Sequence, residues 1–359
     1  MKHLILKYMK IRGKAEMKKI FKTVFVIIGT LIGAGFASGQ EIYIFFYQYG
    51  INGILGITIS SILLGYVVYK VLYICKENNV TNYKNFLKQF IKNEKQLEIF
   101  NTMINIFILI TFYIMIAGFG AYFEQQWGMH SWIGSSLLAL ICYFVFLKDV
   151  SGLIKVSQYI VPLLIGCLLV IGINVIDFEN IFEIVHYVPE NTTWKWISDS
   201  VLYGSYNTIL LIPVLIALRN LVRNKKEQGM ISVLTAILII VLSLIVFFIL
   251  TKIDVNIQNL EMPAVYVASK ISLIFEYIYG FVILSSILTT SISLGTSLLE
   301  NIAHTKKRYK QYAILICISA VLVSNIGFSN LVNALYPIFG YMGLIQIIKI
   351  YLNAEQSLS

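Results

Sequence analysis

Charge is scarce in this chain. Only 13% of its 359 residues are charged and 58% are hydrophobic, whereas soluble domains carry about 25% charged residues. This composition excludes a disordered chain and a conventional soluble enzyme. Cysteine is also rare: the four residues Cys75, Cys142, Cys167 and Cys317 stand in apolar runs without CxxC or Cys/His spacing. We expect them to be packing thiols, because neither metal sites nor disulfide frameworks have this pattern.

What is abundant is long apolar runs. A helix needs about 20 apolar residues to cross a bilayer, and lipid leaves unpaired backbone groups without partners. We therefore predict an all-α integral membrane protein with ten transmembrane helices. The runs are 20–47, 51–74, 99–123, 131–147, 154–176, 197–218, 230–250, 265–299, 312–326 and 331–351.

The same runs divide the chain into five parts. A basic N-terminal extension (1–19) precedes helices 1–5 (20–176), and a loop expected outside the cell (177–196) leads to helices 6–10 (197–352) and a short tail (353–359). Five helices per half invert the second half relative to the first, which predicts a five-plus-five inverted repeat.

The basic residues predict the orientation. The net charge is +10, and most lysines and arginines fall in the N-terminal extension and in loops that share its side, such as 76–95, 219–226 and 306–310. By the positive-inside rule both termini are cytoplasmic in a multi-pass cell-membrane protein. The partner of this charge is then the lipid bilayer and not nucleic acid. The chain is rich in Ile, Asn, Lys and Tyr, which is typical of an A+T-rich bacterial genome.

Two helices carry matching interruptions. Residues 29–41 of helix 1 read GTLIGAGFASGQE, and residues 203–207 of helix 6 read YGSYN, followed by Pro213. Small residues also allow close helix packing. Clusters at equivalent places in inverted halves instead favour unwound segments, so we predict that helices 1 and 6 are discontinuous.

The helix 1 string resembles a known family. Gly33-Ala34-Gly35 is similar to the first-helix signature of the amino acid–polyamine–organocation superfamily, and the whole 29–41 string resembles the YkvI-type amino acid permeases of Gram-positive bacteria. This resemblance implies the LeuT-like fold and alternating access around helices 1 and 6.

An unwound helix 1 predicts a substrate site, because its free N–H groups attract anions such as a substrate carboxylate. The helix 6 break would face these groups, and the resemblance adds a tyrosine of helix 3 that closes the pocket; the alternative for that tyrosine is a packing role. The expected substrate-binding residues are Gly33, Gly35, Ala37, Ser38, Gly39, Tyr113, Tyr203, Ser205 and Asn207. The helix 6 break holds no Asp or Arg, so we expect a small neutral or zwitterionic solute.

The resemblance also implies a sodium site between helices 1 and 8. It places backbone carbonyls of Gly29, Ile32 and Ser286 with the hydroxyls of Thr289 and Thr290. Five oxygens and no thiol or imidazole suit a hard monovalent cation. The helix 5 stretch 155–164 has only apolar residues at the depth where proton-coupled relatives place a lysine, which favours sodium over proton coupling.

Glu41 is the one carboxylate inside helix 1. Intramembrane carboxylates are costly and indicate function, so Glu41 is a candidate coupling group; the alternative is a structural acceptor in an outer vestibule. The leading function is sodium-coupled symport, with no organic cofactor or obligatory protein partner expected. The alternatives are a proton-coupled permease and a non-transporting subunit of the germinant-receptor type. No HExxH, GxSxG or Walker motif supports an enzyme.

The predicted topology has a direct test. A cysteine at Asn224, in a background without the four native cysteines, is expected to resist a membrane-impermeant maleimide in intact cells, because the loop 219–226 is cytoplasmic. A cysteine at Lys252, which is predicted outside, serves as the labelled control. Labelling at position 224 and protection at position 252 would reverse the orientation.

Overall fold

The computed structural model describes residues 2–147, 151–176, 194–222, 224–303 and 305–356. Throughout these residues the chain is helical, with no strand. The expected external loop 177–196 lies outside the described residues up to position 193. The first half contains α1 (Lys2–Leu31), α2 (Ala34–Ser38), α3 (Gln40–Phe45), α4 (Ile51–Glu77), α5 (Tyr83–Lys88), α6 (Glu94–Trp127), α7 (Ser131–Phe146) and α8 (Ser151–Val175).

The second half repeats the sequence of long helices. It contains α10 (Lys195–Leu218), α11 (Lys225–Leu250), α12 (Pro263–Ile271), α13 (Leu273–Ile302), α14 (Lys306–Ser324) and α15 (Phe328–Gln356). Each predicted apolar run lies in these helices, with three boundary differences. The extension 1–19 is helical from Lys2 and continuous with α1, α15 continues into the expected tail, and the run 265–299 is divided at Ser272 into α12 and α13.

Polar side chains begin several of these helices. Asn224 Oδ1 accepts the Glu227 N–H at the start of α11 (2.9 Å), and Thr305 Oγ1 accepts the Arg308 N–H at the start of α14 (3.3 Å). Ser272 caps α13 in the same way, which explains why the predicted run divides there. Such caps satisfy N–H groups that have no partner inside the helix.

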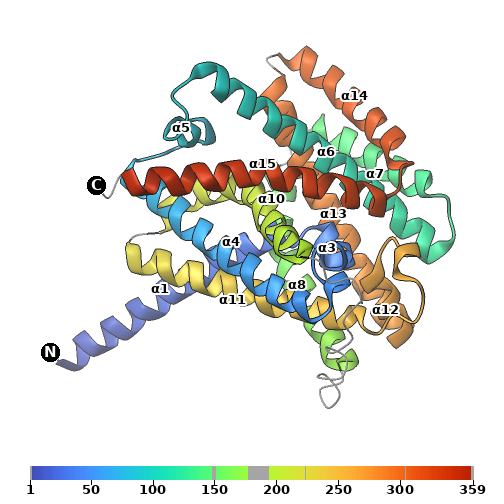
Figure 1. Cartoon of the computed structure of the whole chain (residues 1–359), viewed down its shortest axis with the longest axis horizontal. Coiled ribbons are helices and arrows are strands. Elements are labelled where there is room, and N and C mark those ends of the chain that lie inside the picture. The colour runs from blue at the N-terminus through green and yellow to red at the C-terminus, as the bar shows by residue number, and fades with distance from the viewer. Residues whose placement is uncertain (1, 148–150, 177–193, 223, 304, 357–359) are drawn as a thin grey trace.

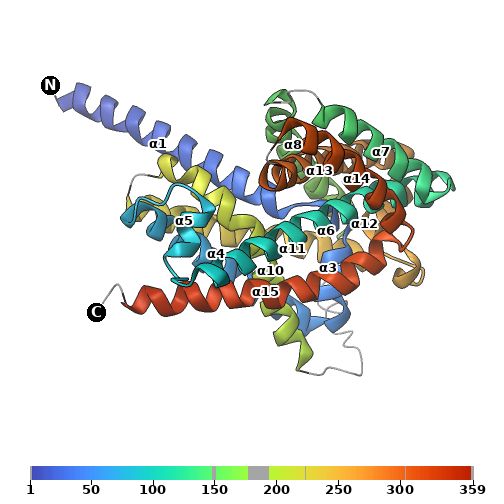
Figure 2. The same ribbon diagram turned by 90° about the horizontal axis from the view of Figure 1, so that it is seen from above.

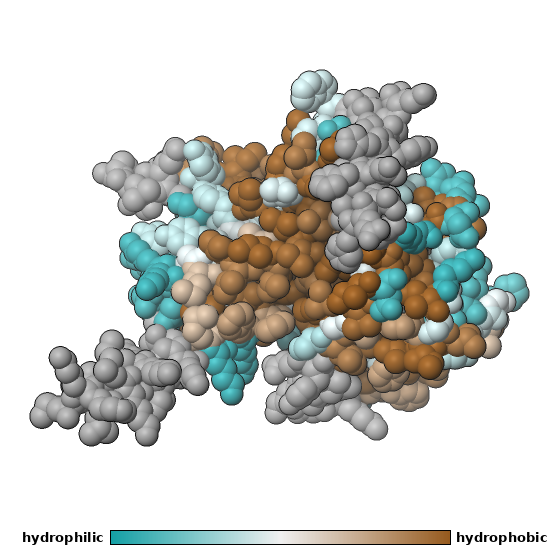
Figure 3. Space-filling model, turned by 90° about the horizontal axis from the view of Figure 1, so that it is seen from below, coloured by the Kyte–Doolittle hydropathy of each residue, from teal (hydrophilic) through white to brown (hydrophobic). Residues whose placement is uncertain are grey.

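The surface has the pattern of a membrane protein. Six described helices are long and apolar enough to cross a bilayer, namely α4, α6, α10, α11, α13 and α15, and α7 and the segment Ile160–Val175 are shorter apolar helices. Figure 3 shows a broad hydrophobic face between two hydrophilic edges. Leu55, Ile62 and Phe281 expose half or more of their surface on such faces, which is favourable in lipid and not in water.

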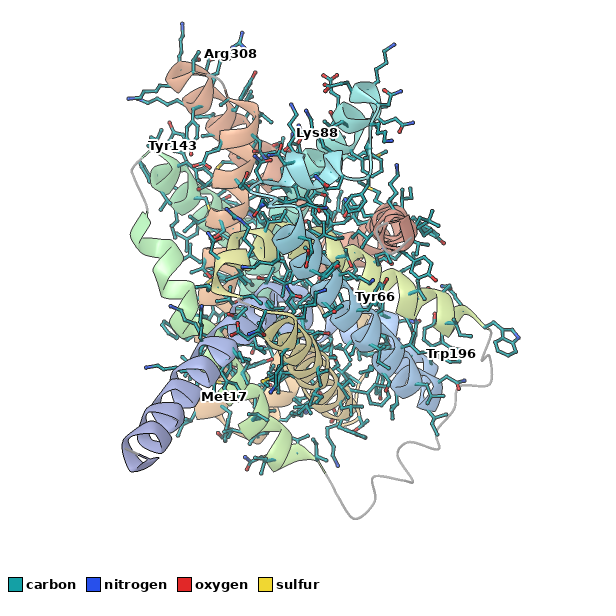
Figure 4. The ribbon with its side chains drawn as sticks, turned by 90° about the vertical axis from the view of Figure 1, so that its left-hand side faces the viewer. Met17, Tyr66, Lys88, Tyr143, Trp196 and Arg308 are labelled. Atoms are coloured by element: carbon teal, nitrogen blue, oxygen red, sulfur yellow. The ribbon has the colours of Figure 1, made fainter. Side chains whose placement is uncertain are left out.

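Both chain ends lie at one end of the molecule. In Figures 1 and 2, α1 begins and α15 finishes at the same end, beside α5, whereas α12 lies at the opposite end. We name these the terminal end and the α12 end. Figure 4, seen from the terminal end, shows Lys88 of α5 and Arg308 of α14 at the rim of the molecule. The first and the last helix of the chain therefore reach the same side of the molecule.

Helix α10 is the centre of the packing. It lies between α4 and α15 (Figures 1 and 2) and also contacts α1. The contact with α15 is so close that a Cβ on Gly343 would lie 1.8 Å from the Ser205 carbonyl oxygen. Small residues allow such approach between membrane helices, where dispersion and not the hydrophobic effect drives association.

We therefore predict that Gly343→Ala destabilises the protein by about 1–3 kcal/mol, because the added methyl group forces α10 and α15 apart. Thermal unfolding of the purified protein in detergent measures this loss. Gly229→Ala in α11 is the matched control, since its Cβ meets nothing within 4 Å. Equal melting temperatures for the two variants would contradict the close α10–α15 contact.

Candidate functional site: a cavity at the break in helix 1

The predicted break in helix 1 is present. The helical ladder of α1 finishes with the Ile32 N–H bonding to the Ile28 carbonyl (2.8 Å), and that of α2 begins with the Ala37 N–H bonding to the Gly33 carbonyl (3.0 Å). The Gly33 N–H turns instead to the Leu31 carbonyl (3.0 Å). The carbonyls of Gly29 and Ile32 are thus left outside both ladders, as a cation site on helix 1 requires.

A second interruption follows at Gly39, which separates α2 from α3. Its φ is +88°, a left-handed conformation that glycine adopts without the penalty of a Cβ. The turn changes the direction of the chain, and α3 forms the last part of helix 1. It also brings the side chain of Glu41, on the first turn of α3, back beside α2.

The Glu41 carboxylate lies at the start of α2, where we expected the carboxylate of the substrate to bind. The Phe36 N–H of α2 donates to its carboxylate, and the Tyr206 hydroxyl of α10 donates to Oε2. The side chain is only 3% exposed. A carboxylate at the start of a helix satisfies the free N–H groups there.

The expected anion site is corrected accordingly. The Ala37 and Gly39 N–H groups bond to the carbonyls of Gly33 and Phe36. Gly35, Ala37, Ser38 and Gly39 do not line the cavity described below. Local sequence shows where N–H groups are left free, but it does not show that the chain's own Glu41 carboxylate accepts from one of them, the Phe36 N–H.

A cavity of about 680 Å³ extends from this break. Glu41, Tyr206 and Tyr336 lie at its inner limit, and the exposed Lys22 of α1 lies toward the terminal end. Its walls come from α1, α6, α8, α10, α13 and α15. The polar lining residues are Lys22, Thr30, Glu41, Thr111, Tyr206, Asn207, Ser286, Thr289, Thr290, Ser293, Ser297 and Tyr336.

Helix 6 is not broken, contrary to the prediction. The α10 helix is continuous over Lys195–Leu218, and its polar side chains bond back to their own helix. The Ser205 hydroxyl donates to the Val201 carbonyl (2.6 Å), and the Thr208 hydroxyl donates to the Gly204 carbonyl (2.9 Å). Hydroxyls satisfied in this way do not require unwinding.

Continuity of α10 decides which of its residues reach the cavity. Residues 206, 210, 213 and 214 share one face of a helix and all line the cavity, with Asn207 beside them. Tyr203 and Ser205 do not line it. Tyr203 packs edge-on against Phe45 and Phe46, with ring centroids 5.4 and 4.8 Å away. The sequence analysis missed Tyr206, which helical spacing from Asn207 and Leu210 could have identified.

Tyr113, which we expected among the substrate-binding residues, also lies elsewhere. Its hydroxyl lies 2.7 Å from the Ser319 hydroxyl of α14, and the side chain does not line the cavity. On α6 the cavity face carries Thr111 and Met115, four residues apart. Tyr113 lies between them in sequence and therefore on the opposite side of the helix.

Four of the five residues expected to bind sodium line one cavity, namely Gly29, Ser286, Thr289 and Thr290. Ile32 is buried and is not among the lining residues. The Thr289 hydroxyl donates to the Ser286 carbonyl (3.0 Å), which leaves its oxygen lone pairs available as acceptors. Helices α1 and α13 thus both contribute residues to this cavity.

The α12 end of the site is closed by hydrogen bonds between distant segments. Gln40 of α3 donates to the Leu260 carbonyl (2.7 Å) and to the Ser329 hydroxyl of α15 (2.9 Å). Gln125 of α6 pairs with both backbone groups of Met262 (2.7 and 2.9 Å). Glu261 accepts the Ser329 N–H (2.6 Å), and burial raises the pKa of this carboxyl above its ordinary value.

Comparisons with known proteins agree with a membrane transporter fold. The crystal structure of a manganese transporter of Eremococcus coleocola, in complex with an aromatic bis-isothiourea substituted compound, matches with a TM-score of 0.59 at 11% identity, over 94% of this chain and 79% of that chain. Two variants of that transporter match equally well. Within the described residues, no group of three or more His, Cys, Asp or Glu side chains could hold a metal ion.

The chain is thus a multi-pass membrane protein with the fold of a solved transporter. It is 30% identical to the uncharacterized membrane protein YkvI of Bacillus subtilis (strain 168) over 324 residues, which span 89% of this chain and 92% of YkvI. It belongs to the YkvI family. The protein YyaD of the same organism is 25% identical over 334 residues, 92% of this chain and 96% of YyaD. No protein-family profile matches the chain.

Two neighbouring glycines test the position of Glu41. A Cβ on Gly35 would lie 2.3 Å from Glu41 Oε1, whereas one on Gly33 meets nothing within 4 Å. We expect Gly35→Ala to displace the carboxylate from the Phe36 N–H and to lower stability by about 1–3 kcal/mol. Gly33→Ala is expected to cost less than about 1 kcal/mol. Thermal unfolding in detergent measures both, and the reverse order would contradict the arrangement.

Proposed function

We propose that this protein is a secondary active transporter that moves a small neutral or zwitterionic amino-acid-like solute by alternating access, coupled to sodium. The observation that carries the proposal is the cavity, whose lining includes Gly29 and Gly33 at the break in helix 1 and the exposed Lys22 of α1. A binding site that is reachable from one side at a time is what alternating access requires.

The closed end supports this reading. Between Glu41 and the α12 end lie the packed rings of Phe45, Phe46 and Tyr203 and the hydrogen bonds of Gln40 to Leu260 and Ser329. With both termini in the cytoplasm, as the charge distribution predicts, the conformation is open to the inside. An outward-open conformation would then need these contacts to separate and the cavity to close around Lys22.

The architecture also supports a five-plus-five repeat. Helix 1 (α1 to α3), α4, α6, α7 and α8 form one set, and α10, α11, α13, α14 and α15 form the other. Helix 1 is interrupted within its length, whereas its counterpart α10 is continuous. In our proposal the break in helix 1 alone therefore provides the free carbonyls, and α10 provides a side-chain face.

Sodium coupling is supported by the convergence of oxygen atoms on the cavity. The Gly29 and Ile32 carbonyls lie outside the helical ladders, and Thr289 and Thr290 line the same cavity. Oxygen donors without thiol or imidazole suit a hard cation. The proposed ligand set contains no carboxylate to balance the charge of a divalent ion such as manganese, so it favours a monovalent cation. Proton coupling remains the second candidate, because Glu41 is a buried carboxylate that lines the cavity.

Transport itself is tested by reconstitution. Proteoliposomes with an inward sodium gradient are expected to accumulate radiolabelled neutral amino acids, and dissipating the gradient with a sodium ionophore should stop accumulation. Binding without accumulation would support the receptor alternative and contradict transport.

The coupling ion is tested on α13. The double change Thr289→Val and Thr290→Val keeps the shape of the side chains but removes two oxygen ligands. We expect it to remove the dependence of solute affinity on sodium, which a coupling of about 1–3 kcal/mol makes about 5–150-fold in the wild type. The measurement is a solute titration at several sodium concentrations, with choline as replacement.

Ser291→Ala is the control for that experiment. The Ser291 hydroxyl is buried, donates to the Ile287 carbonyl (2.7 Å) and does not line the cavity. Its removal is expected to leave the sodium dependence unchanged. A wild-type affinity that ignores sodium but follows pH would overturn sodium coupling and make Glu41 the proton carrier.

A further inference from the structure

Among the residues that the structure describes, no basic side chain pairs with Glu41. The ion pairs found in the described part of the chain join exposed groups, such as Lys88 with Glu94 and Lys225 with Glu77, and none involves Glu41. Lys22 is the basic residue that lines the cavity, and it lies at the opposite limit, near the terminal end. Carboxylates within a membrane almost always pair with another group, because an isolated charge there is expensive.

The carboxylate retains unused acceptor positions. An ionised carboxylate offers about four lone-pair sites, and two are taken by the Phe36 N–H and the Tyr206 hydroxyl. Both are donors on rigid elements. The Tyr206 ring is stacked between Phe45 (5.8 Å) and Tyr336 (4.8 Å between centroids). The oxygens of Glu41 are therefore held in place at the inner limit of the cavity.

The walls next to this carboxylate are largely apolar. Phe107, Ile108, Met115, Ile209 and Leu210 line the cavity from α6 and α10. A solute that fills this space would meet one acid at its inner limit and aliphatic or aromatic surface at its sides. An ammonium group carries three N–H donors and no acceptor, which complements a fixed carboxylate with free lone pairs.

We propose that Glu41 binds the ammonium group of the solute, so that the substrate class is a protonated primary amine on an aliphatic body, including amino acids with aliphatic side chains. The proposal rests on the proposed transport function and deepens it. It reverses the orientation expected from the sequence: the ammonium group, and not the carboxylate, lies at the break in helix 1. A carboxylate on the solute then points toward the hydroxyl groups of α13.

Three probes of one shape separate the two ends of such a solute. Leucine carries both charged groups, isopentylamine lacks the carboxylate and isocaproate lacks the ammonium group. Binding to the purified protein in detergent is measured by isothermal titration and by the shift of the melting temperature. We expect leucine and isopentylamine to bind and isocaproate not to bind.

Four variants assign the effect to the carboxylate. Glu41→Gln keeps an oxygen that accepts from Tyr206 but removes the charge, and is expected to weaken isopentylamine binding by at least about tenfold. Glu41→Asp is expected to retain part of it. Tyr206→Phe keeps the ring stack and is expected to weaken binding less than Glu41→Gln. Glu300→Gln removes an exposed carboxylate of α13 outside the cavity and is expected to change nothing.

The inference is overturned if isopentylamine binds the Glu41→Gln variant with wild-type affinity, if isocaproate binds and the amines do not, or if no amine probe binds the wild type. It is also overturned if Glu41→Gln abolishes stabilisation by sodium alone and leaves amine binding intact, since Glu41 would then hold the coupling ion. Tyr206→Phe decides the question if Glu41→Gln does not fold. Should the amines bind through Glu41 while proteoliposomes accumulate none of them, the transport proposal fails and the ammonium site stands.

Discussion

The Glu41 carboxylate joins the elements on which the cavity depends. It accepts the Phe36 N–H at the start of α2 and the Tyr206 hydroxyl on α10. A helix that stops and restarts inside a bilayer leaves backbone groups that lipid cannot satisfy. Glu41 supplies the missing acceptor from five residues further along the same chain, and the Tyr206 hydroxyl joins that acceptor to α10. The interruption in helix 1 is thus stabilised internally, while its carbonyls remain free to face the cavity.

The two ends of the molecule differ in how they are held. At the α12 end, side-chain amides of α3 and α6 bond to the backbone of the segment that precedes α12, and a ring cluster fills the space beneath. Residues of both α1 and α13 line the cavity. In the proposed alternating-access mechanism, hydrogen bonds that hold one end closed bias the access equilibrium only by the free energy with which they differ between the two states. A ligand that contacts both α1 and α13 would change that proposed equilibrium.

The similarity to solved structures concerns the fold alone. At 11% identity the match with the manganese transporter concerns the arrangement of helices, and chemistry must be read from this chain's own side chains. The cavity lining holds one carboxylate, several hydroxyls and an apolar wall. The sequence similarity to YkvI extends over most of both chains. The break in helix 1 and its carboxylate therefore belong to the region that the two proteins share, and not to an appended segment.

The sequence by itself determined the properties that depend on composition and local order. Apolar length predicted membrane helices, and each predicted run lies mostly in helices, with interruptions in the runs 20–47 and 265–299. The glycines of residues 29–41 predicted the break in helix 1. One of them, Gly39, adopts a backbone conformation that other residues avoid. The grouping of Gly29, Ser286, Thr289 and Thr290 around one cavity also follows the expectation, although that expectation came from a family resemblance.

Only the tertiary structure decided which polar groups face which partner. The sequence of residues 203–207 is the same whether the helix unwinds or its hydroxyls bond back to carbonyls of the same helix. In the structure, α10 stays helical and packs closely against α4 and α15. Tyr113 faces Ser319 because helix rotation is set by neighbouring helices and not by local sequence. The contact of Glu41 with α10 joins residues 165 positions apart. The sequence shows the acid, but only the fold shows that it bonds to the start of α2, lines the cavity and forms no ion pair with any side chain in the described part of the chain.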